Sequence, residues 1–320
     1  MREVVIGIDI GGTYTKYGIV DQFGASLAEG VIATTDYPEV EAFITALDER
    51  IRELRSGIPE TLSVIGAGIG APNGNYYSGT IEFAPNLKWK GIVPFVDIFS
   101  KITGYKTVIT NDANAAAIGE MIFGNAKNLK DFVVITLGTG LGSGIVSGGQ
   151  LVNGHDGFAG EIGHVTYDYN GRMCGCGRKG CLETYASVTG IRRTVFELLA
   201  QKTEDSELRN VSFNDLTGKM ISAAANKGDV IALEAFEITG KILGYKLADT
   251  VAHLSPEAIF LFGGLASAGD LIFQPTHKYL ESHLLRVYQN KIKLLPSGVS
   301  QTNAAISGAG ALAWKEFYKN

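Results

Sequence analysis

The feature that most constrains the fold is a unit of apolar run, glycine-rich turn and second apolar run, which occurs twice. The first copy is VVIGIDIGGTYTKYGIVDQFG, beginning at Val4, and the second extends from DFVVITLG at residue 131 to GSGIVSGGQLV, ending at residue 152. Runs of β-branched residues bounded by glycine are typical of strands, so the first 35 residues predict an antiparallel meander. The repeat indicates two halves, each opening on the same strand–loop–strand unit.

Helical patterns follow these strands. The spacing of apolar residues predicts helices over residues 39–56, 113–124, 230–254, 269–285 and 303–317. Further buried strands are predicted over residues 63–72, 106–112 and 257–264. A chain of 320 residues is long enough for two domains. We expect a smaller N-terminal α/β domain over 1–118 and a larger one over 119–302, with a terminal helix at about 303–320 packing back on the first.

The composition excludes several classes of protein. Apolar residues make up 45% of the chain and charged residues 19%, which is a globular balance, and the net charge is −5. This acidic balance disfavours nucleic acid as a partner. No apolar run approaches the ~20 residues that a membrane-spanning helix needs, and the N-terminus has no signal-peptide pattern. We therefore expect a cytoplasmic protein without a membrane partner.

Glycine loops follow the predicted strands and are candidate phosphate sites. In the first loop, Gly11 and Gly12 would let backbone N–H groups approach a phosphate, while Thr13 and Lys16 could donate to it. Asp9 could hold Mg²⁺ through water. The same residues would also suit a tight hairpin turn without a ligand. Similar loops occur at Gly138, Thr139 and Gly140, and at Gly263 and Gly264.

Asn111 and Asp112 lie where a predicted strand passes into an alanine-rich helix. A carboxylate at this position could take a proton from a hydroxyl group that attacks a phosphoryl group. Aspartate is equally a common helix N-cap, and the sequence alone favours capping.

All three cysteines lie within the segment CGCGRKGC, at Cys174, Cys176 and Cys181. A tetrahedral Zn²⁺ site needs four Cys or His ligands, and His164, ten residues before Cys174, would complete the set. A disulfide or free buried thiols are the alternatives, but a cytoplasmic chain favours the metal. With four protein ligands the metal would be structural.

Three further polar residues stand near these motifs. Glu161 and Glu183 bracket the cysteine segment, where they could accept hydrogen bonds from sugar hydroxyls or simply lie in solvent. Asn86, within APNL, is a candidate polar contact or part of an ordinary turn.

Taken together, these segments resemble the ROK family (repressors, open reading frames and kinases) of sugar kinases over nearly the whole chain. The resemblance depends on IGIDIGGTYTKYGIVD, APNLKW, NDANAAAIGE, VITLGTGLGSGIVSGGQLVNGHDGFAGEIGH and CGCGRKGCLETYAS. It implies the actin-like ATPase (ribonuclease H-like) fold, with two α/β domains and the nucleotide in the cleft between them. It also implies ATP-dependent phosphorylation of a hexose, most similar to the glucokinase type, with Mg²⁺ and structural Zn²⁺.

The resemblance assigns roles residue by residue. Asp112 matches the family's catalytic base. The sugar contacts match Asn86, Asn111, Asp112, Glu161, His164 and Glu183. The phosphate and nucleotide loops match Asp9, Gly11, Gly12, Thr13, Lys16, Gly138, Thr139, Gly140, Gly263 and Gly264. The zinc ligands match His164, Cys174, Cys176 and Cys181. His164 would bind zinc through one ring nitrogen and the sugar through the other. We also expect a homodimer or homotetramer.

Other functions stay open at this point. Kinases of N-acetylmannosamine or N-acetylglucosamine carry nearly the same residues, and fructose is a further alternative acceptor. A non-catalytic sugar-binding regulator would be a different class of protein. The family's usual third glycine is replaced by Leu265, whose side chain could crowd the adenosine pocket and alter nucleotide preference.

We expect no sequence-specific DNA binding, although repressors of this family carry an N-terminal helix-turn-helix domain. The first predicted strand begins by Val4, and the net charge is −5. A gel-shift assay with genomic fragments tests this expectation. A sequence-specific complex that weakens with salt would contradict it.

Overall fold

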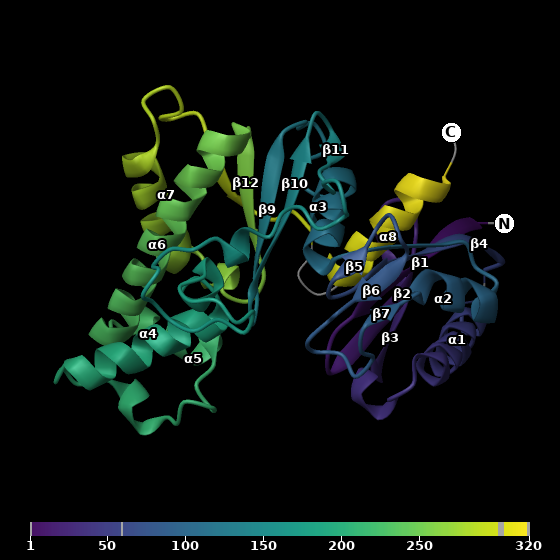
Figure 1. Cartoon of the computed structure of the whole chain (residues 1–320), viewed down its shortest axis with the longest axis horizontal. Helices are drawn as coiled ribbons and strands as arrows, with labels where there is room; N and C mark the ends of the chain where they lie inside the picture. Colours follow the sequence, from purple (N-terminus) through teal and green to yellow (C-terminus); the bar gives the residue numbers. More distant parts are fainter. Residues whose placement is uncertain (1, 59, 300–303, 319–320) are drawn as a thin grey trace. The chain divides into compact units, whose positions relative to one another are not determined.

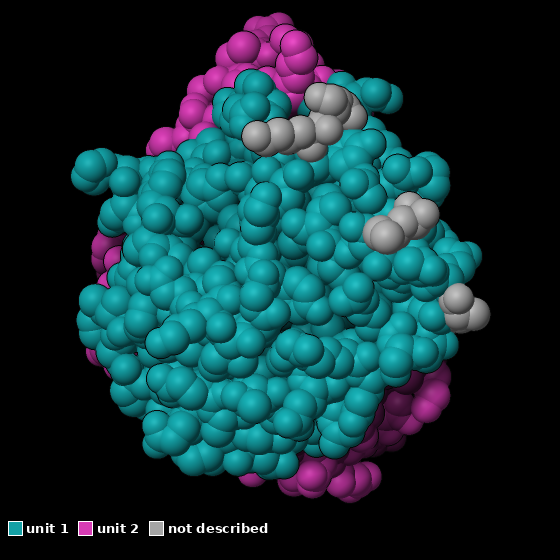
Figure 2. Space-filling model, turned by 90° about the vertical axis from the view of Figure 1, so that its right-hand side faces the viewer, with its two compact units in different colours: residues 1–129, 144–160, 297–320 teal, residues 130–143, 161–296 magenta. Residues whose placement is uncertain are grey.

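The computed structural model describes residues 2–58, 60–299 and 304–318, which form two compact units (Figures 1 and 2). Unit 1 comprises Met1–Leu129, Gly144–Gly160 and Ser297–Asn320, and unit 2 comprises Lys130–Ser143 and Glu161–Pro296. Compared with the expected ranges, residues 119–129 and 144–160 lie with unit 1. None of the helices in the described ranges combines the length and the apolar composition that a membrane-spanning segment needs.

Unit 1 is built on a five-stranded sheet with the order β3-β2-β1-β4-β8. These strands are β1 (Arg2–Ile10), β2 (Tyr14–Val20), β3 (Ser26–Ala33), β4 (Leu62–Gly70) and β8 (Thr107–Thr110). β2 pairs antiparallel with both β1 and β3, which confirms the predicted meander. β4 pairs parallel with β1 and with β8, so β1, β4 and β8 end at the same edge of the sheet.

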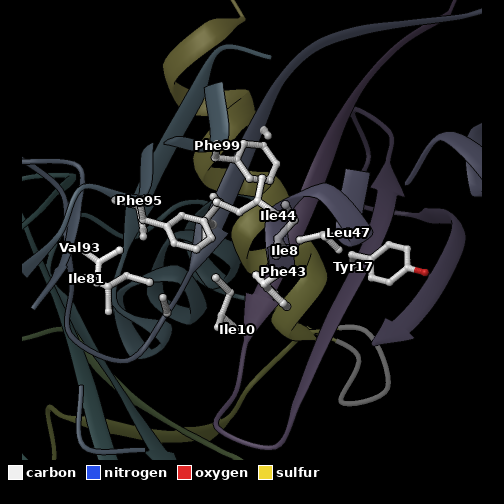
Figure 3. Close-up of a cluster of buried hydrophobic side chains, with 14 of the residues drawn as sticks. Ile8, Ile10, Tyr17, Phe43, Ile44, Leu47, Ile81, Val93, Phe95 and Phe99 are labelled. Carbon is white, nitrogen blue, oxygen red and sulfur yellow. The ribbon is translucent and has the colours of Figure 1, made fainter. Parts of the chain in front are cut away.

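Helices pack on both faces of this sheet. Because successive residues of a strand point to opposite faces, β1 contributes side chains to the packing on each side. Ile6, Ile8 and Ile10 belong to the hydrophobic cluster that also contains α1 and α2 side chains (Figure 3). On the opposite face, Gly7 lies so close to α8 that a Cβ atom would collide with the carbonyl oxygen of Ile306. The helices of unit 1 are α1 (Val40–Ser56), α2 (Phe95–Thr103), α3 (Asp112–Ile122) and α8 (Ala304–Phe317), with the short 3₁₀ turn η1 (Thr34–Asp36).

A small three-stranded sheet, with the order β5-β6-β7, lies in unit 1 and was not predicted. Its strands are β5 (Gly74–Asn75), β6 (Thr80–Glu82) and β7 (Ile92–Val93). Strands of two or three residues are too short to show the alternation that identifies a strand. The segment from β6 to β7 contains Asn86, one of the residues that the sequence analysis expects to contact the sugar.

Unit 2 contains most of a second sheet, whose order is β11-β10-β9-β12-β13. These strands are β9 (Phe132–Leu137), β10 (Leu141–Ser147), β11 (Gln150–Leu151), β12 (Ala258–Phe262) and β13 (Lys293–Pro296). β12 pairs parallel with β9 and β13, and β10 pairs antiparallel with β11. This is the strand pattern of the first sheet, so the predicted internal repeat is confirmed.

The remaining elements of unit 2 are mostly helical. They are α4 (Val188–Gln201), α5 (Gly218–Asn226), α6 (Val230–Leu254) and α7 (Asp270–His283), with the 3₁₀ turns η2 (Ile162–His164), η3 (Leu182–Thr184), η4 (Glu207–Asn210) and η5 (Ala266–Ala268). The helix predicted over 230–254 is confirmed with the same bounds. Asp229 starts it by accepting hydrogen bonds from the N–H groups of Ile231 and Ala232, both at 3.0 Å.

Candidate active site

In unit 1, the carboxyl ends of β1, β4 and β8 bring two aspartates together. Asp9 is paired with Gly70, and Gly70 with Thr110, so the three residues form a row across the sheet. Asp112 follows two residues after Thr110. A Cβ atom at Gly70 would lie 3.8 Å from Oδ1 of Asp9 and 3.7 Å from Cα of Asp112. The glycine therefore leaves open the space that both aspartates border.

The structure decides which of Asn111 and Asp112 caps the following helix. Asn111 is the N-cap of α3, because its Oδ1 accepts a hydrogen bond from the Asn114 N–H at 2.8 Å. The interpretation of Asp112 as the cap is therefore wrong. Its Oδ1 accepts a hydrogen bond from the Ala113 N–H at 2.8 Å, and its side chain reaches solvent. Asp112 is thus held at the helix start without serving as its cap.

The two carboxyl groups favour protonation more than ordinary aspartates do. Desolvation by the surrounding protein and the nearby charge of Asp112 raise the pKa of Asp9 from 3.8 to about 6, while Lys16 opposes this effect. Desolvation also raises the pKa of Asp112, although it is open to solvent at its surface, and the hydrogen bond from Ala113 opposes the rise. Perturbed pairs of this kind are typical of functional sites.

The pKa of Asp9 gives a test by pH. Since it is raised in the folded state, the folded protein binds this proton more tightly than the unfolded chain. The free energy of unfolding should therefore fall as the pH rises from about 4 to about 6. Asp9→Asn removes this loss. At pH 7 we therefore expect the free energy of unfolding of the variant to exceed that of wild type by at most about 3 kcal/mol.

Urea unfolding at pH 4 and pH 7, without nucleotide or divalent cations, measures this difference. Asp97→Asn, at an exposed position of α2, is the matched control. Equal stability of Asp9→Asn and wild type at both pH values would contradict the raised pKa of Asp9.

The first glycine loop lies beside Asp9 and Asn86. Lys16 of β2 is the pairing partner of Asp9 in β1. The loop is closed by a hydrogen bond from the Gly11 N–H to the carbonyl of Tyr14, at 3.0 Å. A Cβ atom at Gly12 would lie 2.7 Å from the backbone oxygen of Asn86, so glycine is needed for this close approach. The structure thus brings together the sequence-predicted residues Asp9, Gly11, Gly12, Thr13, Lys16, Asn86, Asn111 and Asp112 in unit 1.

In unit 2, the second and third glycine loops follow β9 and β12. The Gly138 N–H donates to the carbonyl of Gly140 at 3.0 Å, which closes the turn before β10. Gly263 has a φ of 101°, a conformation that favours glycine. Leu265 is only 1% exposed, and its N–H donates to the carbonyl of Leu137 at 3.0 Å. Its side chain therefore fills the interior of unit 2.

The cysteine segment forms a compact cluster of ligand atoms with His164. One ligand atom from each of the four residues lies within 4.8 Å of the others. Sγ of Cys174 is 3.7 Å from Nδ1 of His164, and the sulfurs of Cys176 and Cys181 are 3.6 Å apart. A tetrahedral Zn–S distance of about 2.3 Å implies ligand atoms about 3.8 Å apart. All three thiols are free, so the disulfide alternative is not observed.

The local backbone explains how this cluster forms. The Cys174 N–H donates to the carbonyl of Arg178 at 2.9 Å, which folds the segment into a narrow loop. Gly177 and Gly180 adopt left-handed φ values of 87° and 72°. Without an ion, burial raises the pKa of the Cys174 thiol to about 12, and coordination by a dication would reverse this preference. The donor set fits Zn²⁺.

The two glutamates near this cluster have different surroundings. Oε2 of Glu161 is 3.9 Å from Nε2 of His164, while Nδ1 of the same ring faces Cys174. Oε2 of Glu183 accepts a hydrogen bond from the Leu141 N–H at 3.0 Å, directly after the second glycine loop. The sequence could not indicate that contact, because 42 residues separate the partners and only the tertiary structure brings them together.

Further residues near Glu161 and His164 were not predicted. A cavity of about 710 Å³ in unit 2 is lined by these two residues and by others that include Thr166, Arg178 and Lys246. Lys246 lies on α6 and forms an ion pair with Asp249 at 2.9 Å. No sequence motif surrounds Lys246, so only the packing of α6 in the structure shows that it lines this cavity.

Comparisons with known proteins identify similar sequences and a similar solved structure. A family model described as "ROK family" matches residues 5–316. A glucokinase of Streptomyces coelicolor is 34% identical over 315 residues, covering 97% of each chain. The xylose repressor of Bacillus subtilis is 29% identical over 98% of this chain and 77% of the repressor. The crystal structure of a ROK family glucokinase from Streptomyces griseus, in complex with glucose and AMPPNP, covers 98% of this chain and 99% of that one, with a TM-score of 0.83 and 34% identity.

Proposed function

The chain belongs to the ROK family, and we propose that it is an ATP-dependent hexose kinase with glucose as the first candidate acceptor. It has the actin-like ATPase fold, built from two α/β units. The glucokinase similarity at 34% identity supports a sugar kinase. Fold alone would not carry the proposal, because related folds host different functions.

The observation that carries the proposal is the position of Asp112 beside Asp9 at the ends of three parallel strands. Because desolvation raises the pKa of Asp112, its carboxylate is a stronger base than an ordinary aspartate. In the proposed reaction it takes the proton from a sugar hydroxyl, that on C6 of glucose. The sugar oxygen then bonds to the γ-phosphorus of ATP as the bond to the β-phosphate oxygen breaks and ADP leaves.

The remaining groups of unit 1 would serve the nucleotide and the sugar. Lys16 and the N–H groups of the Gly11–Thr13 loop would neutralise and bind phosphate oxygens. The carboxylate of Asp9, with its raised pKa, is suited to a nearby cation. Mg²⁺ bound there through water would supply charge neutralisation at the phosphates. Asn86 and Asn111 would hydrogen-bond the sugar.

Unit 2 would contribute the other sugar contacts and the structural metal. Glu161 and His164 line a cavity and offer acceptor and donor atoms to sugar hydroxyls. Zn²⁺ held by His164, Cys174, Cys176 and Cys181 would fix the orientation of the imidazole ring. The Gly138–Gly140 and Gly263–Gly264 loops would bind the nucleotide.

An ADP-release assay with glucose, mannose, fructose, N-acetylglucosamine and N-acetylmannosamine tests the proposal. We expect sugar-dependent ADP release, with the highest kcat/KM for glucose. A higher value for an N-acetylated hexosamine would overturn the assignment of glucose but retain the kinase. Saturable sugar binding without ADP release from any sugar would overturn the kinase itself.

A second candidate function is a non-catalytic sugar-responsive regulator. The observation in its favour is the 29% identity with a xylose repressor over 98% of this chain. The carboxylate pair of Asp9 and Asp112 favours the kinase, since sugar binding alone does not need a base with a raised pKa. Xylose binding measured beside the ADP-release assay separates the two functions.

A further inference from the structure

The carboxylate of Glu183 connects the second glycine loop with the cysteine cluster. Its Oε2 accepts the hydrogen bond from the Leu141 N–H at 3.0 Å. Its Oε1 lies 3.7 Å from Sγ of Cys174. One side chain therefore contacts both a predicted zinc ligand and the residue that directly follows Gly140.

Gly140 is a glycine because of this contact. Its φ is not among the positive values in the described part of the chain, so its backbone conformation does not require glycine. A Cβ atom at Gly140 would instead overlap Oε2 of Glu183. The close contact between the loop backbone and the Glu183 carboxylate therefore requires a residue without a side chain at position 140.

The segment Cys181–Val188 forms a short, internally bonded link between the cluster and the loop. It begins at Cys181, a predicted zinc ligand, whose carbonyl accepts hydrogen bonds from the N–H and Oγ1 of Thr184 at 3.0 and 2.8 Å. Ser187 Oγ donates to the carbonyl of Glu183 at 2.8 Å. At its far end, the Val188 N–H donates to the carbonyl of Gly138 at 2.9 Å. The link thus holds the glycine loop on both sides, at Gly138 and at Leu141.

We propose that Glu183 is a positioning residue that fixes the Gly138–Gly140 loop to the zinc-ligand cluster, so that metal occupancy supports nucleotide binding as well as sugar binding. The loop's affinity for nucleotide rests on the proposed kinase function. The contact with Leu141 does not, and it can be tested separately. An ion that holds Cys181 fixes the backbone two residues before Glu183, and an ion that holds Cys174 fixes the sulfur beside Oε1 of Glu183, so the loop retains the conformation that Glu183 sets.

The first experiment compares Glu183→Ala with Glu183→Gln in the zinc-loaded protein. Hydrogen–deuterium exchange at the Leu141 amide reports the contact, and calorimetry gives the Kd values for AMPPNP and glucose. A lost hydrogen bond to a charged acceptor predicts roughly ten- to a hundred-fold faster exchange and a similar rise in the nucleotide Kd for Glu183→Ala. Glu183→Gln retains an acceptor oxygen, so its Leu141 exchange rate and its nucleotide Kd should both stay close to the wild-type values.

The second experiment is a double-mutant cycle with Gly140→Ala. The added methyl group should displace the carboxylate and reproduce the effect of Glu183→Ala on exchange and nucleotide Kd. If both substitutions break the same contact, the double variant should be no worse than either single variant. Losses that multiply in the double variant would overturn the proposal.

Removal of zinc with a chelator tests the connection to the metal. Leu141 exchange should accelerate in the wild type but change little further in Glu183→Ala. Glu161→Gln is the control, because it should raise the glucose Kd and leave Leu141 exchange unchanged. If wild type binds neither AMPPNP nor glucose, the proposed function fails while the exchange data still decide the contact. If wild type binds both, and Glu183→Ala changes only the glucose Kd, the positioning role is overturned.

Discussion

Replacing Asp112 by asparagine should lower kcat by roughly 10²- to 10⁴-fold and leave sugar binding largely intact. An amide cannot accept the hydroxyl proton at neutral pH, and general bases typically contribute this factor. The fold should tolerate the change, because Asn111, and not Asp112, caps α3. Steady-state kinetics together with the glucose Kd from calorimetry measure both parts of the prediction.

Asp270→Asn supplies a matched control for this experiment. Asp270 is the first residue of α7, as Asp112 is of α3, and it is exposed. The control therefore removes the same charge at the same helical position, and with it the same interaction with the helix dipole. Retention of more than about a tenth of kcat by Asp112→Asn would exclude Asp112 as the base.

The second prediction concerns the candidate zinc site. Purified wild-type protein should contain about one zinc per chain, since three cysteines and one histidine complete a structural site. Cys176→Ser should remove most of the zinc, raise the KM for the sugar and lower the Tm by about 10 °C or more, because structural zinc contributes several kcal/mol to folding. Cys176 is exposed, so lost packing should add little to these effects.

Elemental analysis, thermal melting and kinetics on the folded fraction measure these three quantities. Met173→Leu is the control, because it changes an exposed side chain of the same loop that is not a ligand. Wild-type protein with reduced thiols and no zinc would contradict the metal site. An unchanged sugar KM in zinc-free, folded protein would show that the metal supports only stability.

The local sequence pattern was sufficient to predict the elements that are long or repeated. The periodicity of residues 230–254 predicted α6, and the repeated strand–glycine–strand unit is found at β1–β2 and at β9–β10, in two sheets whose matching strand orders the sequence did not predict. The strands β5 and β7 are two residues long and carry no periodic signal. Residues 144–160 lie with unit 1 although β10 runs without interruption through Ser143 and Gly144, so no break in the sequence marks that division.

The candidate site was predictable where it depends on motifs and not where it depends on tertiary contacts. The spacing of His164 and the three cysteines indicated a cluster that the structure brings together. Asn111 and Asp112 can both cap a helix, so the sequence could not decide which does. The bond between Glu183 and Leu141 and the burial of Leu265 arise from packing within unit 2. Neither has a local sequence signal.

The identity of the phosphorylated product tests the proposed hexose kinase activity most directly. The zinc-loaded protein is incubated with Mg²⁺, ATP and glucose, and the products are followed by phosphorus NMR. We expect glucose 6-phosphate and ADP in equal amounts with wild type, and neither above background with Asp112→Asn. Release of inorganic phosphate at the same rate with and without glucose, and no sugar phosphate, would contradict it.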